Sequence, residues 1–366
     1  MNHMIEYENL QKTNSIFIEN FNESLKSFYN SGWYILGENV VAFEKEYAEY
    51  CNTKYCVSVA SGLDAMIIAL EVNNFPKGSE IIVASNTYIA TILAVIRAGL
   101  KPVLVEPLID TYNINPEQIE QNITTNTKGI LITHLYGRPC AMDRIMELSE
   151  KYELQVFEDC AQAHGAIFNG KTVGSFGIGC HSFYPTKNLG ALGDGGAITL
   201  NDKTLYEKIK AYRNYGSEIK YHNKYIGINS RLDEIQAIFL RLKLKSLGQI
   251  NDKKIQLAEV YDNLLTNDVT KPFANVNEKH VFHIYNIRCS KRDKLKNALL
   301  SENIKTEIHY PIAPHHQEGY KSVLKGYFPI SEEIHNTTLS LPIAFFHTKE
   351  DIAKVSEIIN YTLKKI

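Results

Sequence analysis

The alternation of short apolar runs with helical patterns constrains the fold of this chain more than any other feature. The runs are apolar and largely β-branched, and most are followed by a turn or a helical segment. Strands that alternate with helices predict βαβ units and a mainly parallel sheet with helices on both faces. Up to about residue 245 the chain therefore predicts an α/β fold. The expected strands span residues 80–85, 101–106, 128–135, 154–159, 178–184 and 196–200.

The sequence pattern changes beyond about residue 250. Residues 231–247 form a long amphipathic helical pattern that is able to cross into a second domain. After it come strand-like alternation at 281–289, a helical pattern around 291–303 and a C-terminal helical pattern. We expect a large domain of residues 1–248 and a smaller α+β domain of residues 249–366.

Charge and cysteine content exclude several classes of partner and cofactor. The 39 Lys+Arg and 41 Asp+Glu residues give a formal net charge of −2 without blocks of like charge, which argues against nucleic acid or an anionic membrane as a partner. The six cysteines form no CxxC pair, and the N-terminus lacks an apolar signal segment, so we expect free thiols in a cytoplasmic protein. We expect no metal site, because the adjacent residues His315 and His316 rarely chelate one ion without further ligands.

The segment HSFYPTKNLGALGDGGAI (181–198) presents Lys187 in a polar turn after a strand-like run. The glycines that follow indicate a backbone that turns at close quarters. An amine that is shielded from water and near other cations loses its proton more easily, which suits a lysine that forms a Schiff base. The alternative is a surface lysine beside a glycine-rich hairpin. A P-loop is disfavoured because GxxxxGK[ST] is absent.

The segment EDCAQAHGA (158–166) places Asp159 at the end of an apolar strand. Ligands of α/β proteins bind at this edge of a parallel sheet, and a buried carboxylate there needs a partner. A protonated pyridine nitrogen is one such partner, and their ion pair makes pyridoxal phosphate (PLP) an electron sink. Gln162 and His164 follow within reach of the same pocket. A metal ligand and a helix N-cap are the alternatives for Asp159.

Two weaker segments fit the same interpretation. Ser61 and Gly62 precede a helical pattern, and a helix N-terminus with free N–H groups binds phosphate. Tyr88 follows a strand in SNTYIAT (85–91) and is able to stack on a flat heteroaromatic ring. Taken singly, an ordinary helix start and a core tyrosine explain both.

These four segments, in this order, resemble the DegT/DnrJ/StrS family of PLP-dependent nucleotide-sugar aminotransferases over nearly the whole chain. EDCAQAHGA and FYPTKNLGALGDGGAI carry the resemblance, and GINSRLDEIQAI (227–238) fits the next signature of the family. The resemblance implies the aspartate-aminotransferase-like fold, called fold type I. It also implies PLP as cofactor, with pyridoxamine phosphate (PMP) in the second half-reaction.

The resemblance implies a role for each matched residue around the cofactor ring. Lys187 matches the lysine that binds the cofactor covalently and moves protons. Asp159 matches the partner of the pyridine nitrogen. Tyr88 matches the ring that stacks on the cofactor, and Gln162 matches the group near its phenolic oxygen. Because this chain keeps Lys187, transamination is favoured over the water elimination of relatives that carry histidine there.

The phosphate site implied by the resemblance crosses between two subunits. Ser182 and the backbone of Gly62 and Leu63 match the groups that hold the cofactor phosphate. Asn229 resembles the residue that reaches the phosphate of the neighbouring subunit. The resemblance therefore implies a homodimer with shared active sites.

The resemblance also implies the substrates, L-glutamate as amino donor and a nucleotide-linked keto sugar as acceptor. SGLDAM (61–66) is similar to the subgroup that aminates carbon 3 of a dTDP-3-keto-6-deoxyhexose, whereas carbon-4 enzymes more often have NATSAL here. The product is a dTDP-3-amino-3,6-dideoxyhexose for surface glycan or other deoxyamino-sugar synthesis. Residues in loops that resemble substrate-contacting loops are the candidate sugar-nucleotide contacts. They are Tyr34, Tyr184, Tyr221, His309 and Tyr310.

Three alternative functions remain open at this point. A carbon-4 aminotransferase uses the same cofactor residues. A dehydratase or an aminotransferase of a free cyclitol is a further PLP enzyme. A binding or regulatory protein on the same scaffold is the third, although Lys187 and Asp159 together argue against it. A nicotinamide oxidoreductase is disfavoured, because no GxGxxG fingerprint follows an early strand.

Overall fold

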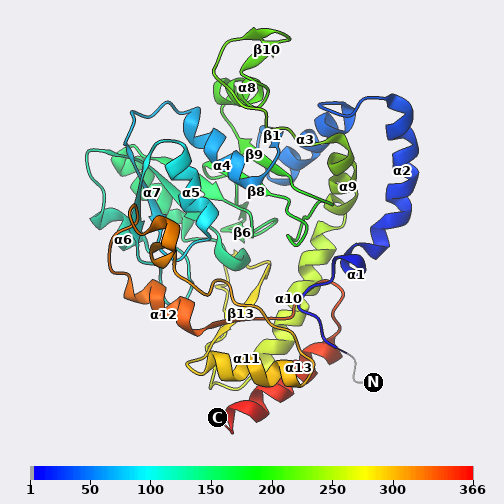
Figure 1. Cartoon of the computed structure of the whole chain (residues 1–366), viewed down its shortest axis with the longest axis vertical. Helices are drawn as coiled ribbons and strands as arrows, with labels where there is room; N and C mark the ends of the chain where they lie inside the picture. The colour runs from blue at the N-terminus through cyan, green and yellow to red at the C-terminus, as the bar shows by residue number, and fades with distance from the viewer. Residues whose placement is uncertain (1–3, 366) are drawn as a thin grey trace.

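The structure is a computed structural model that describes residues 4–365. Its central feature is a seven-stranded sheet (Figure 1). β2 pairs in parallel with β3 and β4, and the parallel pairing continues through β5 to β8. β9 runs antiparallel to both β8 and β1, so the expected mainly parallel sheet is confirmed. In sheet order the strands are β1 (Tyr55–Val59), β9 (Gly196–Leu200), β8 (Ile178–Ser182), β5 (Gln155–Asp159), β4 (Thr127–Thr133), β2 (Glu80–Ala84) and β3 (Lys101–Val105).

Helices cover both faces of this sheet, because successive strand residues point to opposite sides. On β2, Ile81 and Val83 join one apolar cluster, and Ile82 joins another on the opposite face. The first face is covered by α4 (Gly62–Glu71), α5 (Ile89–Arg97) and α8 (Lys203–Tyr212). The second face is covered by α3 (Glu38–Tyr50), α6 (Pro116–Gln121), α7 (Met142–Tyr152) and α9 (Glu234–Leu244). All six expected strands belong to this sheet, whereas β1 was not predicted.

The C-terminal part has a separate apolar core, built on an antiparallel pair of strands. The N-terminal segment contributes to this core, because Ile5 is buried in it and forms a bridge with Ile304. The expected helix at 231–247 is shorter than predicted: it is α9, which ends at Leu244, and a separate helix that begins at Leu247 continues into the C-terminal part (Figure 1). A domain boundary at residue 248 stays a prediction. The elements are α10 (Leu247–Leu264), β13 (Tyr285–Arg288), α11 (Arg292–Ser301), α12 (Pro329–Thr337), β14 (Thr338–Leu341) and α13 (Lys349–Leu363).

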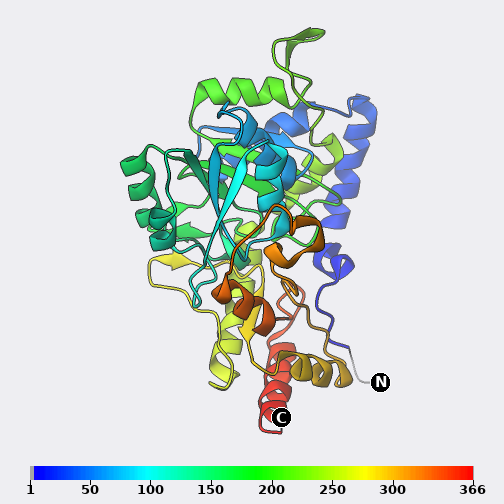
Figure 2. The ribbon, with the colours of Figure 1, turned by 60° about the vertical axis from the view of Figure 1, so that its left-hand side comes forward.

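The remaining elements lie at the periphery. α1 (Leu10–Asn14), a 3-10 helix (Ser15–Phe17) and α2 (Ile18–Ser31) run along one side of the molecule, and α2 packs against α9. The hairpin of β10 (Ser217–Ile219) and β11 (His222–Asn223) projects from the body in both ribbon views (Figure 2). A small sheet contains β6 (Ile167–Phe168), β7 (Lys171–Thr172) and β12 (Glu278–Lys279). Further 3-10 helices span Leu135–Gly137, Pro314–His316 and Glu318–Tyr320.

The structure also shows the state of the cysteines and whether any helix could span a membrane. All six cysteines are buried and free, as predicted. Among the described residues, no helix is both long enough and apolar enough to cross a membrane.

Candidate active site

Lys187 lies in the loop that joins β8 to β9. Backbone hydrogen bonds close this loop on itself: Phe183 N donates to Gly195 O at 2.8 Å, and Lys187 N donates to Tyr184 O at 2.9 Å. A Cβ at Gly190 would lie 2.2 Å from Pro185 O, so only glycine fits there. The loop therefore turns at close quarters, as its glycines predicted.

The amine of Lys187 is positioned for chemistry at near-neutral pH. Burial lowers the pKa of Lys187 to about 8, against the attraction of Asp159, which raises it. A lowered pKa increases the fraction of neutral amine, and the neutral amine is the form that attacks a carbonyl carbon. The interaction with Asp159 also shows that the two residues singled out in the sequence face the same site.

Asp159 is the last residue of β5 and is buried. Its Oδ2 accepts a hydrogen bond from Thr91 Oγ1 at 2.7 Å, and its Oδ1 accepts one from Ala161 N at 3.1 Å. Burial raises the pKa of Asp159, while these two bonds and Lys187 lower it. The carboxylate is thus oriented by the protein but lacks a fully compensating cation, which a protonated pyridine nitrogen would supply.

Thr91 is a site residue that the sequence reasoning missed. It lies in the first turn of α5, and its hydroxyl also contacts Thr87 Oγ1 at 2.9 Å. Thr87 Oγ1 in turn contacts Thr133 Oγ1 at 2.7 Å. These hydroxyls connect α5 to the ends of β4 and β5. A threonine near the start of a helix gives no signal of this kind in the sequence. Only the packing at the edge of the sheet shows that Thr91 holds Asp159.

Gln162 links the Asp159 loop to the C-terminal part. Its Oε1 accepts from Tyr136 N at 2.6 Å, and its Nε2 donates to Tyr310 Oη at 2.9 Å. The Tyr310 ring lies 5.0 Å from the Tyr88 ring, centroid to centroid. Tyr310, which belongs to the loop between α11 and α12, therefore lies beside Gln162 and Tyr88, the two cofactor residues expected from the sequence. Burial raises the pKa of the Tyr310 hydroxyl, so it stays protonated at neutral pH.

His309 lies on the same side as Tyr310. Its Nδ1 is 2.9 Å from Ser340 Oγ, and its carbonyl accepts a hydrogen bond from Tyr136 Oη. Burial, and to a smaller extent the nearby charge of Lys187, lower the pKa of His309 to about 4. His309 is therefore a neutral imidazole at neutral pH. His309 is thus close enough to Lys187 to respond to its charge, and Tyr310 is the next residue; contact of either with the sugar stays a prediction.

The residues expected to hold a phosphate meet where α4 begins beside the end of β8. Ser61 is the N-cap of α4, and its Oγ accepts from Asp64 N at 3.1 Å. A Cβ at Gly62 would lie 2.5 Å from Ser182 Cβ, so glycine is required for this approach. The N-terminal N–H groups of Gly62 and Leu63 and the Ser182 hydroxyl therefore share one location. Together with the positive end of the helix dipole they suit a phosphate.

Three predicted residues are not joined to this site within one chain. Asn229 is exposed and donates to Tyr215 Oη at 2.8 Å. Tyr221 is 86% exposed on the projecting β10–β11 hairpin. The Tyr34 ring packs on Phe28 beside α2, with centroids 5.1 Å apart. Tyr184 does lie beside Lys187 in sequence and is half exposed.

The expectation that His315 and His316 lack a further possible ligand is wrong. The sequence offered no further ligand to His315 and His316, but the structure brings Glu332 of α12 to both, at 3.1 Å and 3.5 Å from their Nε2 atoms. The ligand atoms of these three residues all lie within 4.8 Å of one another. The first of these distances is that of an ordinary hydrogen bond between a buried imidazole and a carboxylate. His315 Nδ1 has no partner in the described structure, whereas a metal-bound histidine normally donates its second N–H.

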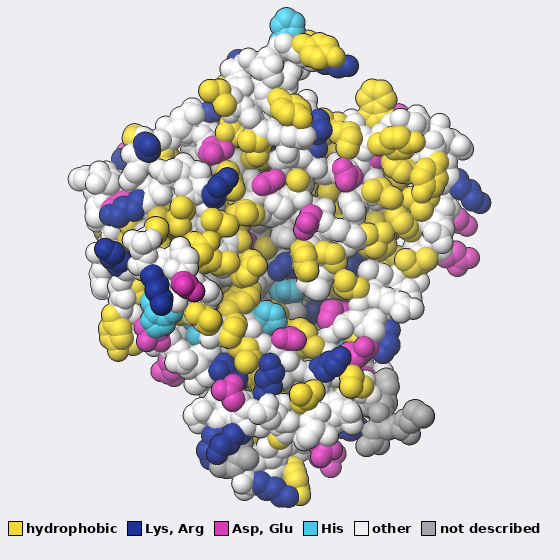
Figure 3. Space-filling model, viewed as in Figure 1, with side chains coloured by type: hydrophobic (Ala, Val, Ile, Leu, Met, Phe, Trp, Pro, Cys, Tyr) yellow, Lys and Arg dark blue, Asp and Glu magenta, His cyan; other side chains and the backbone are white. Residues whose placement is uncertain are grey.

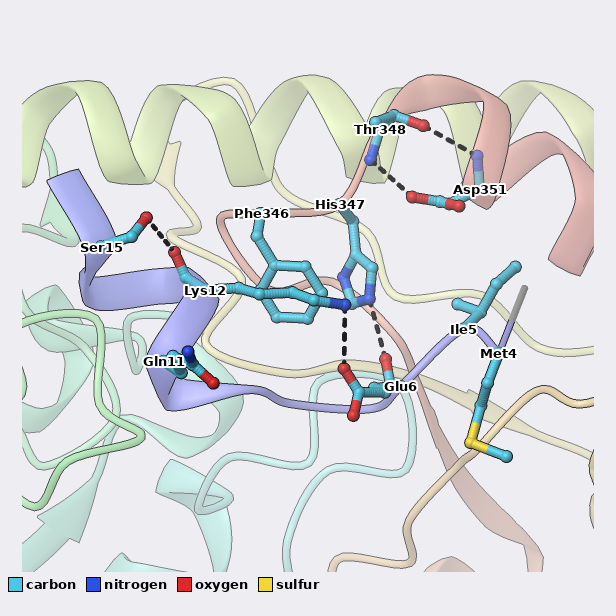
Figure 4. Close-up of a pocket in the computed structure, with 10 residues that line it drawn as sticks. All are labelled: Met4, Ile5, Glu6, Gln11, Lys12, Ser15, Phe346, His347, Thr348 and Asp351. Carbon is cyan, nitrogen blue, oxygen red and sulfur yellow. Dashed lines mark hydrogen bonds and ion pairs between the residues drawn. The ribbon is translucent and has the colours of Figure 1, made fainter.

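A cavity of about 540 Å³ lies away from Lys187, between the N-terminal segment and the start of α13 (Figure 4). Its polar groups pair with one another: Lys12 Nζ binds Glu6 Oε2 at 3.0 Å, and the Thr348–Asp351 capping box closes the end of α13. Because these pairs are already satisfied, we assign no chemistry to this cavity.

The residues around Lys187 fit PLP. A lysine with a lowered pKa, a buried carboxylate at the end of the neighbouring parallel strand, a helix N-terminus beside a serine and an exposed tyrosine ring match the reactive, pyridine, phosphate and flat parts of that cofactor. On a mainly parallel sheet covered on both faces, this set defines a PLP-dependent aminotransferase of fold type I.

Comparison with known proteins agrees. Residues 16–360 match the DegT/DnrJ/EryC1/StrS aminotransferase family. A dTDP-3-amino-3,6-dideoxy-alpha-D-galactopyranose transaminase of Aneurinibacillus thermoaerophilus is 46% identical over 359 residues, which cover 98% of this chain and 99% of that protein. The crystal structure of S. venezuelae DesV matches with a TM-score of 0.97 and 36% identity over 99% of both chains. Bacillus subtilis ntda with bound cofactor PMP matches with a TM-score of 0.91 and 28% identity, over 99% of this chain and 85% of that one.

The chain belongs to the DegT/DnrJ/EryC1/StrS aminotransferase family. It is a PLP-dependent sugar aminotransferase, and both the expected fold type and the expected cofactor are confirmed.

Proposed function

We propose that this enzyme moves an amino group from L-glutamate to carbon 3 of a dTDP-linked 3-keto-6-deoxyhexose. The observation that carries the proposal is the 46% identity, over 98% of this chain, to a transaminase whose name specifies a dTDP-3-amino-3,6-dideoxy sugar. The ring of Tyr310 contacts those of Tyr88 and His309, so the residue proposed to stack on the cofactor lies beside the two proposed to contact the sugar.

Each cofactor residue has a distinct task in this proposal. When bound, PLP supplies an electrophilic carbon and an electron sink. Lys187 Nζ takes the proton from the α-carbon of the amino donor and returns it on the cofactor side, as general base and then general acid. The Asp159 carboxylate holds the proton on the pyridine nitrogen, and Thr91 holds that carboxylate. With the keto sugar bound, Lys187 moves the same proton in the reverse direction.

The remaining cofactor residues bind and orient. Tyr88 covers one face of the ring, and Gln162 lies near its phenolic oxygen. The Ser182 hydroxyl and the N–H groups of Gly62 and Leu63 hold the phosphate, where the N-terminal end of α4 favours its charge. This arrangement fixes the reacting carbon next to Lys187.

We infer a homodimer in which each subunit completes the site of its partner. Asn229 and Tyr221 are exposed in the single chain, and Tyr221 lies on the projecting β10–β11 hairpin, which suits residues that act in a neighbouring subunit. Hydrophobic side chains gather over α2 and α3 on the face shown in Figure 3, and the exposed ones include Trp33, Tyr34 and Val41. Exposed apolar patches of this kind are typical of protein–protein interfaces.

We place the sugar and its nucleotide against side chains at the mouth of the site. His309 and Tyr310 offer a neutral imidazole and a protonated phenol to sugar hydroxyls. Tyr184 lies in the Lys187 loop, half exposed. Tyr34 and Tyr221 join them in the dimer, because both are exposed in the single chain.

The proposal is tested by reversing the second half-reaction. Purified PLP enzyme is mixed separately with a dTDP-3-amino-3,6-dideoxyhexose and a dTDP-4-amino-4,6-dideoxyhexose, and the yellow visible band is followed, with Lys187→Ala as control. We expect loss of the band with the 3-amino sugar alone. Loss with the 4-amino sugar alone would assign the enzyme to carbon 4. A protein that takes up PLP but reacts with no amino sugar and no amino acid would instead indicate a binding or regulatory role.

A further inference from the structure

A second, smaller cavity adjoins the active site, and of the residues that line it only His309 has a role in the function proposed above. Its volume is about 130 Å³, roughly four times the share of one water molecule in the liquid. Thr186, which precedes Lys187, and His309 line one side of it. Lys254 and His283, from the start of the C-terminal part, line another side. The cavity therefore adjoins the loop that carries Lys187, whose charge acts on both His283 and His309, and a second lysine lines it.

Lys254 is the charged group of this cavity. It lies on α10 and is only 5% exposed. Its Nζ donates to His283 O at 3.2 Å, and no carboxylate of the described residues forms an ion pair with it. Burial lowers the pKa of Lys254 to about 8, so it carries a proton in much of the enzyme near neutral pH. A buried ammonium with one neutral acceptor is costly unless an anion completes its coordination.

The other polar groups of the cavity do not supply an anion that binds the Lys254 ammonium. His283 Nδ1 is buried and has no hydrogen-bond partner in the described structure. Glu8 lines the cavity and its charge raises the pKa of Lys254, but Glu8 Oε1 accepts hydrogen bonds from Asn9 N and Thr13 Oγ1, each at 2.9 Å. Glu8 is thus held by the N-terminal segment. A carboxylate that enters from the Lys187 side would meet Lys254 first.

We propose that Lys254 binds a carboxylate of the amino donor while the α-carbon of that donor lies beside Lys187. The inference rests on the proposed use of an amino acid as donor and makes Lys254 a specificity-determining residue of that half-reaction. An amino acid carries its reacting carbon within a few bonds of a carboxylate, and this cavity holds a buried cation next to the loop that carries Lys187. The amino sugar has no carboxylate, so the sugar half-reaction does not need Lys254.

The two half-reactions separate this role from a structural one. Lys254→Met removes the charge and keeps the length of the side chain. In single-turnover experiments with PLP enzyme, we expect its apparent dissociation constant for L-glutamate to rise about 10- to 100-fold, which is the value of one lost bond to a charged group. The rate and affinity with the amino sugar should stay within about twofold of wild type. Lys254→Arg, which keeps the charge, should restore most of the affinity for glutamate.

Lys253→Met is the matched control, because Lys253 precedes Lys254 on the same helix and does not line the cavity. Calorimetry with glutarate, an unreactive dicarboxylate, measures binding without turnover, and Lys254→Met should lose it. Unchanged glutamate and glutarate binding in Lys254→Met, or equal losses in both half-reactions, would overturn the proposal. If wild type reacts with no amino sugar, the proposed sugar substrate fails, while the glutarate measurement still decides the role of Lys254.

Discussion

Thr91→Val tests how the protein holds the carboxylate that pairs with the cofactor. Valine matches threonine in shape but cannot donate a hydrogen bond, so the change removes the 2.7 Å bond from Thr91 Oγ1 to Asp159 Oδ2. The bond from Ala161 N to Oδ1, at 3.1 Å, remains. A hydrogen bond to a charged group is worth about 1.5–3 kcal/mol, or about a 10- to 100-fold change in an equilibrium constant.

The pH at which the effect appears follows from the direction of the Asp159 pKa. Burial raises that pKa in the free protein, and Thr91 opposes the rise. Where Asp159 of the apoenzyme is protonated, PLP binding must ionise it, and the variant lacks the Thr91 bond that favours the ionised form. Where it is already ionised, the bond is lost from both states and the effect cancels. We therefore expect PLP binding to weaken by up to about 100-fold at the acidic end, with little change at alkaline pH.

The assay is titration of apoenzyme with PLP across a pH series, read from the visible absorbance. Thr87→Val is the matched control, because Thr87 contacts Thr91 and Thr133 but not Asp159. Thr87→Val should lower the free energy of unfolding by as much as Thr91→Val does, without the pH-dependent loss of affinity for PLP. Equal affinity for PLP in Thr91→Val and wild type at every pH would refute the reasoning, and so would an equal loss in Thr87→Val.

Three further predictions concern the active-site charges and the strand that carries Asp159. Lys187→Ala should lower the rate of both half-reactions by about 10²–10⁴-fold, measured in single turnovers with PLP added, while the circular dichroism spectrum stays unchanged. When PLP is added to apoenzyme, Asp159→Asn should form the yellow band at lower pH than wild type does. Asp159 raises the pKa of Lys187, so its removal leaves more of the amine neutral. A shift of band formation to higher pH would contradict this. Glu158→Gln should lower the free energy of unfolding by about 3–5 kcal/mol at pH 7, in urea titrations, because Glu158 accepts from Gly174 N, Phe176 N and Gly177 N inside the protein. Burial raises the pKa of Glu158, but the bonds to His134 and to these amides outweigh it, so the pKa lies below the ordinary value of 4.5. The ionised Glu158 therefore stabilises the fold above pH 4.5, and this stabilisation is lost as the pH falls through the lowered pKa. The difference in free energy of unfolding between variant and wild type should shrink at that acidic pH.

Most of the sheet could be predicted from the sequence, because parallel strands buried on both faces are continuous apolar runs. β1 escaped prediction because its sequence, YCVSV, mixes polar and apolar residues; it pairs with β9 on one edge only. The predicted helix at 231–247 ran past the end of α9 at Leu244 to the start of α10 at Leu247. Amphipathic periodicity does not show where one helix ends and the next begins.

The candidate site was predictable where chemistry and local sequence coincide. Lys187 and Asp159 each follow a strand of the sheet, so both come to the same edge, and their motifs indicated this. Thr91 and Lys254 were not predictable, because their roles depend on contacts between segments distant in the chain. Asn229 illustrates the opposite case: its motif stands out in the sequence, but in one chain its side chain is exposed and donates to Tyr215.

The most direct measurement identifies the lysine that holds PLP. The enzyme is incubated with PLP, reduced with borohydride, digested and examined by mass spectrometry. We predict a pyridoxyl group on the peptide that contains Lys187 and none on the peptide that contains Lys254, with no label on Lys187→Ala. A label on another lysine of the wild type, or no label on any, would contradict the assignment of Lys187 as the cofactor lysine.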